Sequence, residues 1–135
     1  MKWLLDTNTL SELTKPAPAR ELIDWLEANE SEAGFSAITI GEMVAGIELL
    51  PEGKKRRTLE RALKFLREDY AGKIFDFTEG AAVEWRRLVA KAKSAGRNLS
   101  VLDSQIEAIA IHFNLTGVTR NNADFFHPVF NPWKP

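Results

Sequence analysis

Apolar residues recur along the chain in two patterns, and these patterns predict where strands and helices lie. Short apolar runs bounded by turn residues are typical of buried strands. Such runs predict four strands, at residues 3–5, 33–37, 73–77 and 116–119. The segment "PVFN" (128–131) is a candidate for a last strand at the edge of the sheet, because proline is tolerated at an edge.

Apolar residues three, four and seven positions apart predict six helices between these strands. The predicted helices, in chain order, are "TNTLSEL" (7–13), a helix that carries Leu22, Ile23, Trp25 and Leu26, "TIGEMVAGIELL" (39–50), residues 58–70, a helix from a Thr78 cap to near Gly96, and residues 103–113. Strands and helices therefore alternate. This order is typical of an α/β sandwich with a mostly parallel sheet, in one domain covering residues 1–135.

Composition narrows the class of protein. The chain has 135 residues, of which 44% are hydrophobic, enough for one sizeable core. The opening "MKWLLDTNTL" is too short for a signal peptide, and no run approaches the roughly 18 apolar residues of a membrane span. The absence of cysteine excludes disulfides, thiolate metal sites and cysteine nucleophiles. We expect a soluble, cytoplasmic protein.

The net charge of −1 argues against a broad basic surface for nucleic acid. Any contact with nucleic acid must be local, or must be assisted by a metal ion or by another chain.

Acidic residues follow the predicted strands. Asp6 follows the first strand, Glu42 lies in the first turn of the helix after the second, and Asp124 lies in the loop after the fourth. Asp103 opens its helix and joins the others if that helix end points the same way. Ligands of open parallel sheets bind beyond the carboxyl ends of the strands, so these four acids are candidates for one site.

Each acid also has a purely structural interpretation. Asp6 can cap the following helix. Thr39-x-x-Glu42 fits a capping box, in which two side chains satisfy backbone N–H groups, and Ser100-x-x-Asp103 fits the same pattern more loosely. Asp124 lies in an asparagine-rich turn, where aspartate is common. Capping explains each acid alone, but it does not explain why all four lead to one edge.

Converging carboxylates repel one another, and a hard divalent cation relieves this repulsion. Mg²⁺ and Mn²⁺ prefer oxygen ligands, and they can activate water and neutralise charge on a phosphate. No histidine is needed, and the chain has only His112 and His127. The lack of G-x-S-x-G argues against a Ser/His/Asp hydrolase. A phosphoaspartate enzyme is disfavoured because Asn8 stands where its second aspartate would be.

Four segments resemble the motifs of a known family. "LLDTNTLSEL", "SAITIGEMVAGIELL", "LDSQIEAIAI" and "GVTRNNADF" are similar, in this order, to the motifs of PIN-domain ribonucleases of the VapC type, including their FitB-like branch. These are toxins of type II toxin–antitoxin pairs. The resemblance covers nearly the whole chain. It implies a three-layer α/β/α sandwich and a metal-dependent endoribonuclease that hydrolyses RNA through water activated by Mg²⁺ or Mn²⁺.

Carried over residue by residue, the resemblance implies a catalytic set of Asp6, Glu42, Asp103 and Asp124. Asp6, Asp103 and Asp124 would bind the metal, and Glu42 would bind a second ion or hold a water. The supporting polar positions would be Asn8, Thr119 and Asn121. Glu107 departs from the small residues usual after the third acid. We expect its side chain to be solvated; the alternative is that it extends the acidic pocket.

The resemblance also implies partners: an RNA substrate, a VapB-like antitoxin that blocks the acidic site, and a second copy in a homodimer. The candidate RNA-binding residues are Arg120 and the run Lys54, Lys55, Arg56 and Arg57, for which a solvated helix face is the alternative. A second functional hypothesis is a catalytically weak binding module in a DNA-binding complex with the antitoxin. The intact acids favour the nuclease.

Overall fold

A four-stranded parallel sheet lies at the centre of the computed structural model, which describes residues 1–134. The sheet consists of β1 (Trp3–Leu5), β2 (Ala33–Ser36), β3 (Ile74–Phe75) and β4 (Thr116–Val118), in the order β3-β2-β1-β4. All three neighbouring pairs are parallel, with Leu5 opposite both Phe35 and Val118. All four strands therefore end at the same edge.

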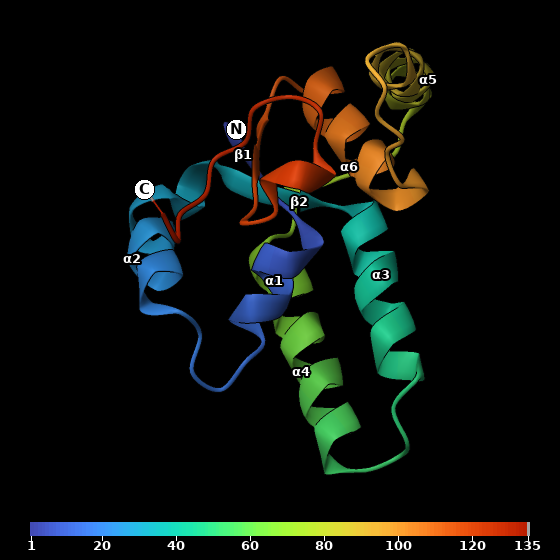
Figure 1. The fold of residues 1–135 in the computed structure, drawn as a ribbon. Coiled ribbons are helices and arrows are strands. Elements are labelled where there is room, and N and C mark those ends of the chain that lie inside the picture. The colour runs from blue at the N-terminus through green and yellow to red at the C-terminus, as the bar shows by residue number, and fades with distance from the viewer. Residues whose placement is uncertain (135) are drawn as a thin grey trace.

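Helices cover both faces of this sheet, as Figure 1 shows. The helices are α1 (Thr7–Leu13), α2 (Arg20–Asn29), α3 (Ala37–Glu48), α4 (Lys54–Asp69), α5 (Glu79–Ser94) and α6 (Val101–His112). On one side of the sheet lie α5 and α6, and on the other lie α1, α2 and α4. Together α3 and α4 form a long hairpin that projects from the body. The predicted α/β/α sandwich is confirmed.

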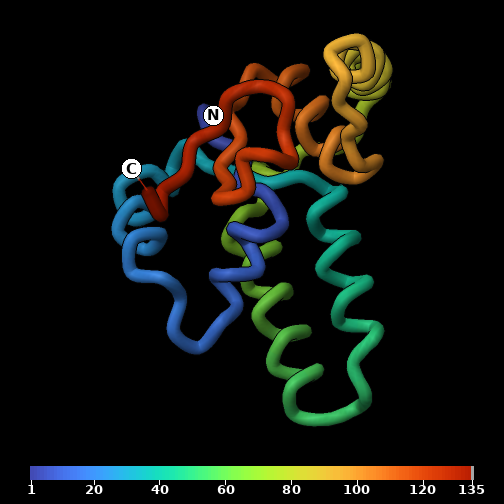
Figure 2. The backbone as a smooth tube through the Cα atoms, in the orientation of Figure 1, coloured from blue at the N-terminus to red at the C-terminus, as the bar shows by residue number. Residues whose placement is uncertain are grey.

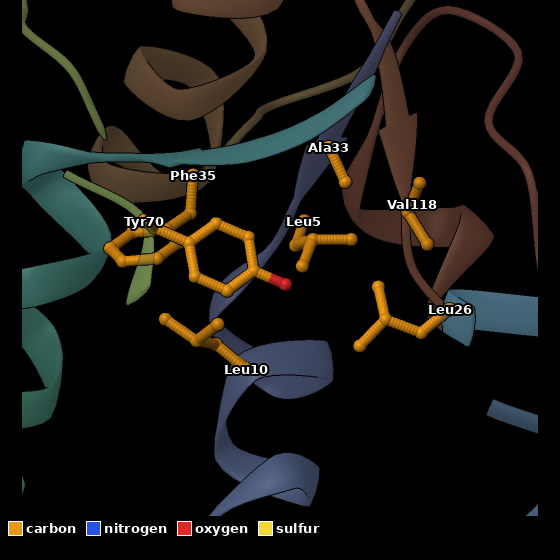
Figure 3. Close-up of a cluster of buried hydrophobic side chains, with 7 residues drawn as sticks. All are labelled: Leu5, Leu10, Leu26, Ala33, Phe35, Tyr70 and Val118. Carbon is orange, nitrogen blue, oxygen red and sulfur yellow. The ribbon is translucent and has the colours of Figure 1, made fainter. Parts of the chain in front are cut away.

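Two apolar clusters hold the layers together, one on each face of the sheet. Side chains of a strand alternate between the two faces, so Leu4 and Leu5 enter different clusters. Figure 3 shows the cluster formed by Leu5, Leu10, Leu26, Ala33, Phe35, Tyr70 and Val118. The other cluster packs α5 and α6 against the sheet through Leu4, Ala81, Ile106, Ile109, Ala110 and Phe125. The predicted apolar faces of these helices are thus the faces that are buried.

Gly34 allows the edge strand β3 to approach β2 closely. A Cβ atom at this position would lie 2.3 Å from the backbone carbonyl oxygen of Lys73 and 2.9 Å from the ring of Phe75. Because the first of these atoms belongs to the backbone, no side-chain rotation relieves the overlap.

Several predicted boundaries differ from the structure. The third strand has two residues instead of five, because the chain turns at Asp76, whose carbonyl accepts the N–H of Thr78. The helix predicted from residue 58 begins one turn earlier, at Lys54. The edge strand predicted at 128–131 is wrong: Phe130 forms only an isolated bridge with Val118.

The C-terminal segment runs from the α6 side of the molecule toward α2, as the red tube in Figure 2 shows. Along this path the ring of Phe130 packs 5.4 Å from those of both Trp3 and Trp25. A short 3-10 turn, η2 (Asn122–Asp124), precedes this packing. Among residues 1–134, no helix is long and apolar enough to cross a membrane.

Candidate acidic site at the carboxyl edge of the sheet

The neighbouring strands β1 and β4 bring the first parts of the site together. Asp6 follows β1 directly, and its N–H donates to the carbonyl of Val118, the last residue of β4 (3.1 Å). The same carbonyl accepts the hydroxyl of Thr9 (2.9 Å). Thr119 follows β4 and is fully buried. The parallel register therefore places Asp6 beside Thr119, although 113 positions separate them in the sequence.

Asp6 is both a helix cap and a buried acid of the site. Its Oδ1 accepts the N–H of Thr9 (2.8 Å), which caps α1. Its residue surface is only 5% exposed. Burial raises the pKa of Asp6, contacts with the Thr119 hydroxyl and with Thr9 oppose this rise, and the charge of Asp103 adds to it. The two interpretations of Asp6 are thus compatible.

Asp103 lies in the first turn of α6 but does not begin the helix, contrary to the prediction. Ser100 is the cap: its Oγ accepts the N–H of Asp103 (3.2 Å) and donates to Oδ2 of Asp103 (2.7 Å). The Ser100-x-x-Asp103 pairing exists, with the serine as the capping residue. The bond to Oδ2 fixes the carboxylate and leaves Oδ1 without a hydrogen bond from the described residues.

Asp124 is half-buried in the short turn η2, and its pKa is raised by burial and then by the charge of Asp103. Asp103 therefore acts electrostatically on both Asp6 and Asp124. A cavity of about 340 Å³ opens beside Asp103 and Asp124, and it is also lined by Arg97 and Ser100. Three of the four predicted acids share one electrostatic environment at the carboxyl edge.

Glu42 reaches the site through a hydrogen bond. The prediction that it lies in the first turn of its helix and pairs with a Thr39 cap is wrong. Ser36, at the end of β2, caps α3 by accepting the N–H of Thr39 (3.0 Å), so Glu42 lies in the second turn. Its Oε1 accepts the hydroxyl of Thr7 (2.6 Å), the residue after Asp6. Sequence reasoning missed Thr7, which connects the fourth acid to the first.

The supporting polar positions differ in their surroundings. The hydroxyl of Thr119 accepts the backbone N–H of Asn121 (3.0 Å), at the start of the loop that leads to Asp124. Asn8 and Asn121 are exposed, and within residues 1–134 neither side chain forms a hydrogen bond. Thr119 is thus buried beside Asp6, whereas Asn8 and Asn121 are exposed.

Glu107 neither projects into solvent nor extends the acidic pocket. Its side chain is 3% exposed and accepts three hydrogen bonds from the chain after Asp124: the backbone N–H groups of Phe126 (2.8 Å) and His127 (2.9 Å), and a ring nitrogen of His127 (2.7 Å). The expectation of a solvated side chain is wrong because these distant backbone donors satisfy the carboxylate in the interior.

The predicted RNA-binding residues separate into two groups. Lys54, Lys55 and Arg57 are exposed on α4. Arg56, by contrast, is 16% exposed and contacts the carboxylates of Glu48, Glu52 and Glu60. Arg120 is exposed and lies 4.9 Å over the ring of Trp133. Arg56 is thus engaged within the protein, and the other four remain open to a ligand.

The carboxylate oxygens present suit Mg²⁺ or Mn²⁺, but they do not form a complete cage. Within residues 1–134, no three acidic or histidine side chains gather closely enough to hold a metal ion by themselves. Mg²⁺ typically uses one or two carboxylates and completes its shell with waters and substrate phosphates. The raised pKa values of Asp6 and Asp124 mark a place where a cation would relieve unfavourable charge.

Comparison with known proteins agrees with this arrangement. The PIN-domain family profile matches residues 3–129. The chain is 37% identical to the toxin FitB of Neisseria gonorrhoeae, with 96% of this chain and 97% of FitB covered. It is 32% identical to the VapC ribonuclease Y4jK of Sinorhizobium fredii, with 98% of each covered.

The fold agrees as well. The structure of FitAB bound to an IR36 DNA fragment superposes with a TM-score of 0.88 at 36% identity, covering 97% of this chain and 95% of that one. The four-stranded parallel sheet and the acids at its carboxyl edge therefore belong to a PIN domain, and this chain is a member of the PIN-domain family. Within the family it is a VapC-type toxin similar to FitB.

Proposed function

We propose that this protein is a metal-dependent endoribonuclease that acts as the toxin of a toxin–antitoxin pair. The observation that carries the proposal is the shared electrostatic environment of Asp6, Asp103 and Asp124 at the carboxyl edge of the sheet. The similarity to the VapC ribonuclease Y4jK and to the toxin FitB supports both parts of the proposal.

The three aspartates would hold Mg²⁺ or Mn²⁺, and each carboxylate has different surroundings. Asp6 is fixed by the N–H of Thr9, Asp103 is fixed through Oδ2 by Ser100, and Asp124 stands at the cavity beside Asp103. A bound ion supplies Lewis-acid chemistry, lowering the pKa of water and neutralising charge on phosphate. Glu42, whose carboxylate accepts the hydroxyl of Thr7, would orient a water or bind a second ion.

A groove suggests where RNA meets the protein. A cavity of about 310 Å³ extends from Thr7 and Glu42 along α3 to Lys55 on α4. An ammonium group at the far end of this groove suits a phosphate of the RNA backbone. Lys55 is therefore the α4 cation that we assign to RNA binding, together with Arg120 beside the site.

The Lys55 assignment has its own test. Lys55→Gln should raise the KM for RNA several-fold and change kcat little, because a phosphate contact outside the reacting centre contributes to binding. Lys93→Gln, an exposed lysine on α5, is the matched control. An unchanged KM in Lys55→Gln would remove Lys55 from the RNA surface.

The central experiment measures cleavage of total RNA by antitoxin-free protein in Mg²⁺, in Mn²⁺ and in EDTA. Wild type is compared with Asp103→Asn, and with Asp24→Asn, which removes an exposed acid on α2. We expect metal-dependent cleavage in wild type and in Asp24→Asn, and none in folded Asp103→Asn. Cleavage in EDTA, or equal activity in Asp103→Asn, would contradict the metal mechanism.

A second candidate function is a weakly active module within a DNA-binding complex. The similarity to the structure of FitAB bound to a DNA fragment favours it. The two functions differ in one result. A weak module would shift operator DNA together with its antitoxin but would leave RNA intact in the presence of metal.

The similarity to the FitAB complex also supports a proposal about partners. We propose a VapB-like antitoxin that covers the acidic site and a second copy of this chain in a homodimer. Light scattering of the free protein and of the complex with its antitoxin would give both stoichiometries.

A further inference from the structure

Of the three aspartates of the site, Asp124 lies on the backbone segment with the least regular structure. Asp6 follows a strand and Asp103 lies on a helix, whereas Asp124 lies in the short turn η2. Among the described residues, the backbone bonds near Asp124 in this turn run from its own N–H to the carbonyl of Asn121 (3.0 Å) and from the N–H of Phe125 to the carbonyl of Asn122 (3.3 Å). We call residues 121–127 the Asp124 loop. Its position must be set largely by groups outside it.

Arg97 holds this loop on both sides of Asp124. Its Nη2 donates to the carbonyl of Ala123 (2.7 Å) and to the carbonyl of Phe125 (3.0 Å), the two residues that flank Asp124. The guanidinium group also lies 5.7 Å over the ring of Phe126. Arg97 stands in the turn between α5 and α6 and lines the cavity shared by Asp103 and Asp124.

Glu107 holds the same loop from α6. Its two oxygens accept the N–H groups of Phe126 and His127, and a ring nitrogen of His127 completes the arrangement. Burying a carboxylate is costly unless it is fully hydrogen-bonded, and here all the recorded partners come from the end of the loop. Figure 1 shows the red turn lying beside α6.

The two side chains act on complementary groups of one loop. The guanidinium of Arg97 donates to the carbonyl oxygens on either side of Asp124. The carboxylate of Glu107 accepts the N–H groups two and three residues after Asp124. Glu107 lies four residues after Asp103, one turn along the same helix face. The helix that carries one acid of the site therefore also fixes the loop that carries another.

We infer that Arg97 and Glu107 are positioning residues that clamp the Asp124 loop and set the carboxylate of Asp124 relative to that of Asp103. The inference rests on the proposed function, because it concerns how well these carboxylates bind a metal ion. Neither side chain is assigned contact with the ion or with RNA. Both act through the backbone of the loop.

The test measures binding of Mn²⁺ alone by calorimetry, with no RNA present. Arg97→Met keeps an unbranched apolar stem and removes the guanidinium donors, and Arg87→Met, at an exposed arginine on α5, is the matched control. Glu107→Gln keeps the size and loses one acceptor. We expect about tenfold weaker Mn²⁺ binding in Arg97→Met and Glu107→Gln, the order of loss found when groups that orient metal ligands are removed. Arg97→Lys should recover part of the affinity.

A double variant separates positioning from general destabilisation. If Arg97 acts through Asp124, then adding Arg97→Met to Asp124→Asn costs little further Mn²⁺ affinity, because the two changes remove the same contribution. Additive losses would overturn the inference. Amide hydrogen exchange adds a readout that needs no metal: exchange at residues 122–127 should rise in Arg97→Met while exchange in α2 stays constant.

The outcomes for the inference and for the proposed function are distinct. Wild type that binds Mn²⁺, with unchanged affinity in Arg97→Met and Glu107→Gln, overturns the clamp and leaves the metal site in place. Unchanged exchange in the loop also overturns the clamp. Wild type that binds no Mn²⁺ contradicts the metal mechanism, and the inference fails with it.

Discussion

Asp6 combines two roles with opposite effects on stability. As a cap it stabilises α1, and as a buried charge close to Asp103 it opposes folding, which is why its pKa is raised. Active sites often retain such unfavourable groups because function requires them. The two roles can be separated by a replacement that keeps the cap and removes the charge.

Asp6→Asn is that replacement, since asparagine caps helices as well as aspartate does. In EDTA at neutral pH, we expect a higher thermal midpoint than in wild type, because the buried charge is gone. RNA cleavage in Mg²⁺ should fall by more than about 100-fold, as a ligand contributes at least as much as the groups that orient it. A lower midpoint in EDTA would show that the ionised carboxylate of Asp6 stabilises the fold.

Tyr70 provides a spectroscopic report on the core, because it is the only tyrosine in the chain. Burial raises its pKa from 10.0 to about 12, with the charges of Glu30 and Asp69 adding to the effect. Between these two values the folded state holds a proton that the unfolded state has lost. The contribution of Tyr70 to stability is therefore complete below pH 10 and lost as the pH rises toward 12.

We therefore expect phenolate absorbance to appear near pH 12 and together with unfolding, not near pH 10. Tyr70→Phe should lose less stability over the same interval, measured by denaturant unfolding at each pH. Phenolate that forms near pH 10 in the folded protein would mean that water reaches the ring hydroxyl.

Among the elements, the pairing of the edge strand β3 with β2 depends on the small size of residue 34. Gly34→Ala should lower the free energy of unfolding by about 1–3 kcal/mol, the usual effect of overpacking, because the added methyl group meets the carbonyl of Lys73. Gly41→Ala is a control of opposite sign. A Cβ at Gly41, in α3, meets nothing within 4 Å, so alanine should stabilise this helix by about 0.5–1 kcal/mol. Equal effects in the two variants, measured by denaturant unfolding, would contradict the close approach of β3.

The elements were predictable where burial is periodic. Ile106 and Ile109 face the core because their spacing matches the turn of a helix. Helix starts were less predictable: Ser36 and Gly53 are the N-cap residues that precede α3 and α4, and they lie outside the apolar pattern. The prediction of an edge strand at residues 128–131 failed because a local sequence pattern does not reveal how many backbone hydrogen bonds will form with the neighbouring strand.

The site was predictable to a similar extent. A parallel sheet requires the ends of β1, β2 and β4 to meet at one edge, so the acids after those strands were expected there. The environments of Thr7, Arg97 and Glu107 were not predicted. Their partners lie 19 to 35 positions away, and those of Arg97 and Glu107 are mostly backbone groups, which have no signature in a single sequence.

For the whole molecule, the acidic edge should make stability depend on the metal ion. An ion that binds only the folded protein stabilises it by about 2.7 kcal/mol at a concentration 100 times its dissociation constant. The effect is expected to be specific because the proposed ion would join carboxylates from three parts of the chain, after β1, on α6 and after β4. Binding should therefore stabilise the fold as a unit and not one helix alone.

We expect Mg²⁺ or Mn²⁺ to raise the thermal midpoint of wild type, and EDTA to reverse the rise. Asp103→Asn should abolish the shift, because Asp103 is the acid whose charge acts on both Asp6 and Asp124. Asp24→Asn should keep the full shift, which controls for the loss of one negative charge elsewhere on the surface. An equal shift in Asp103→Asn would mean that the ion stabilises the protein from a different place, and the proposed assignment of Asp103 would then be wrong even if RNA cleavage requires metal.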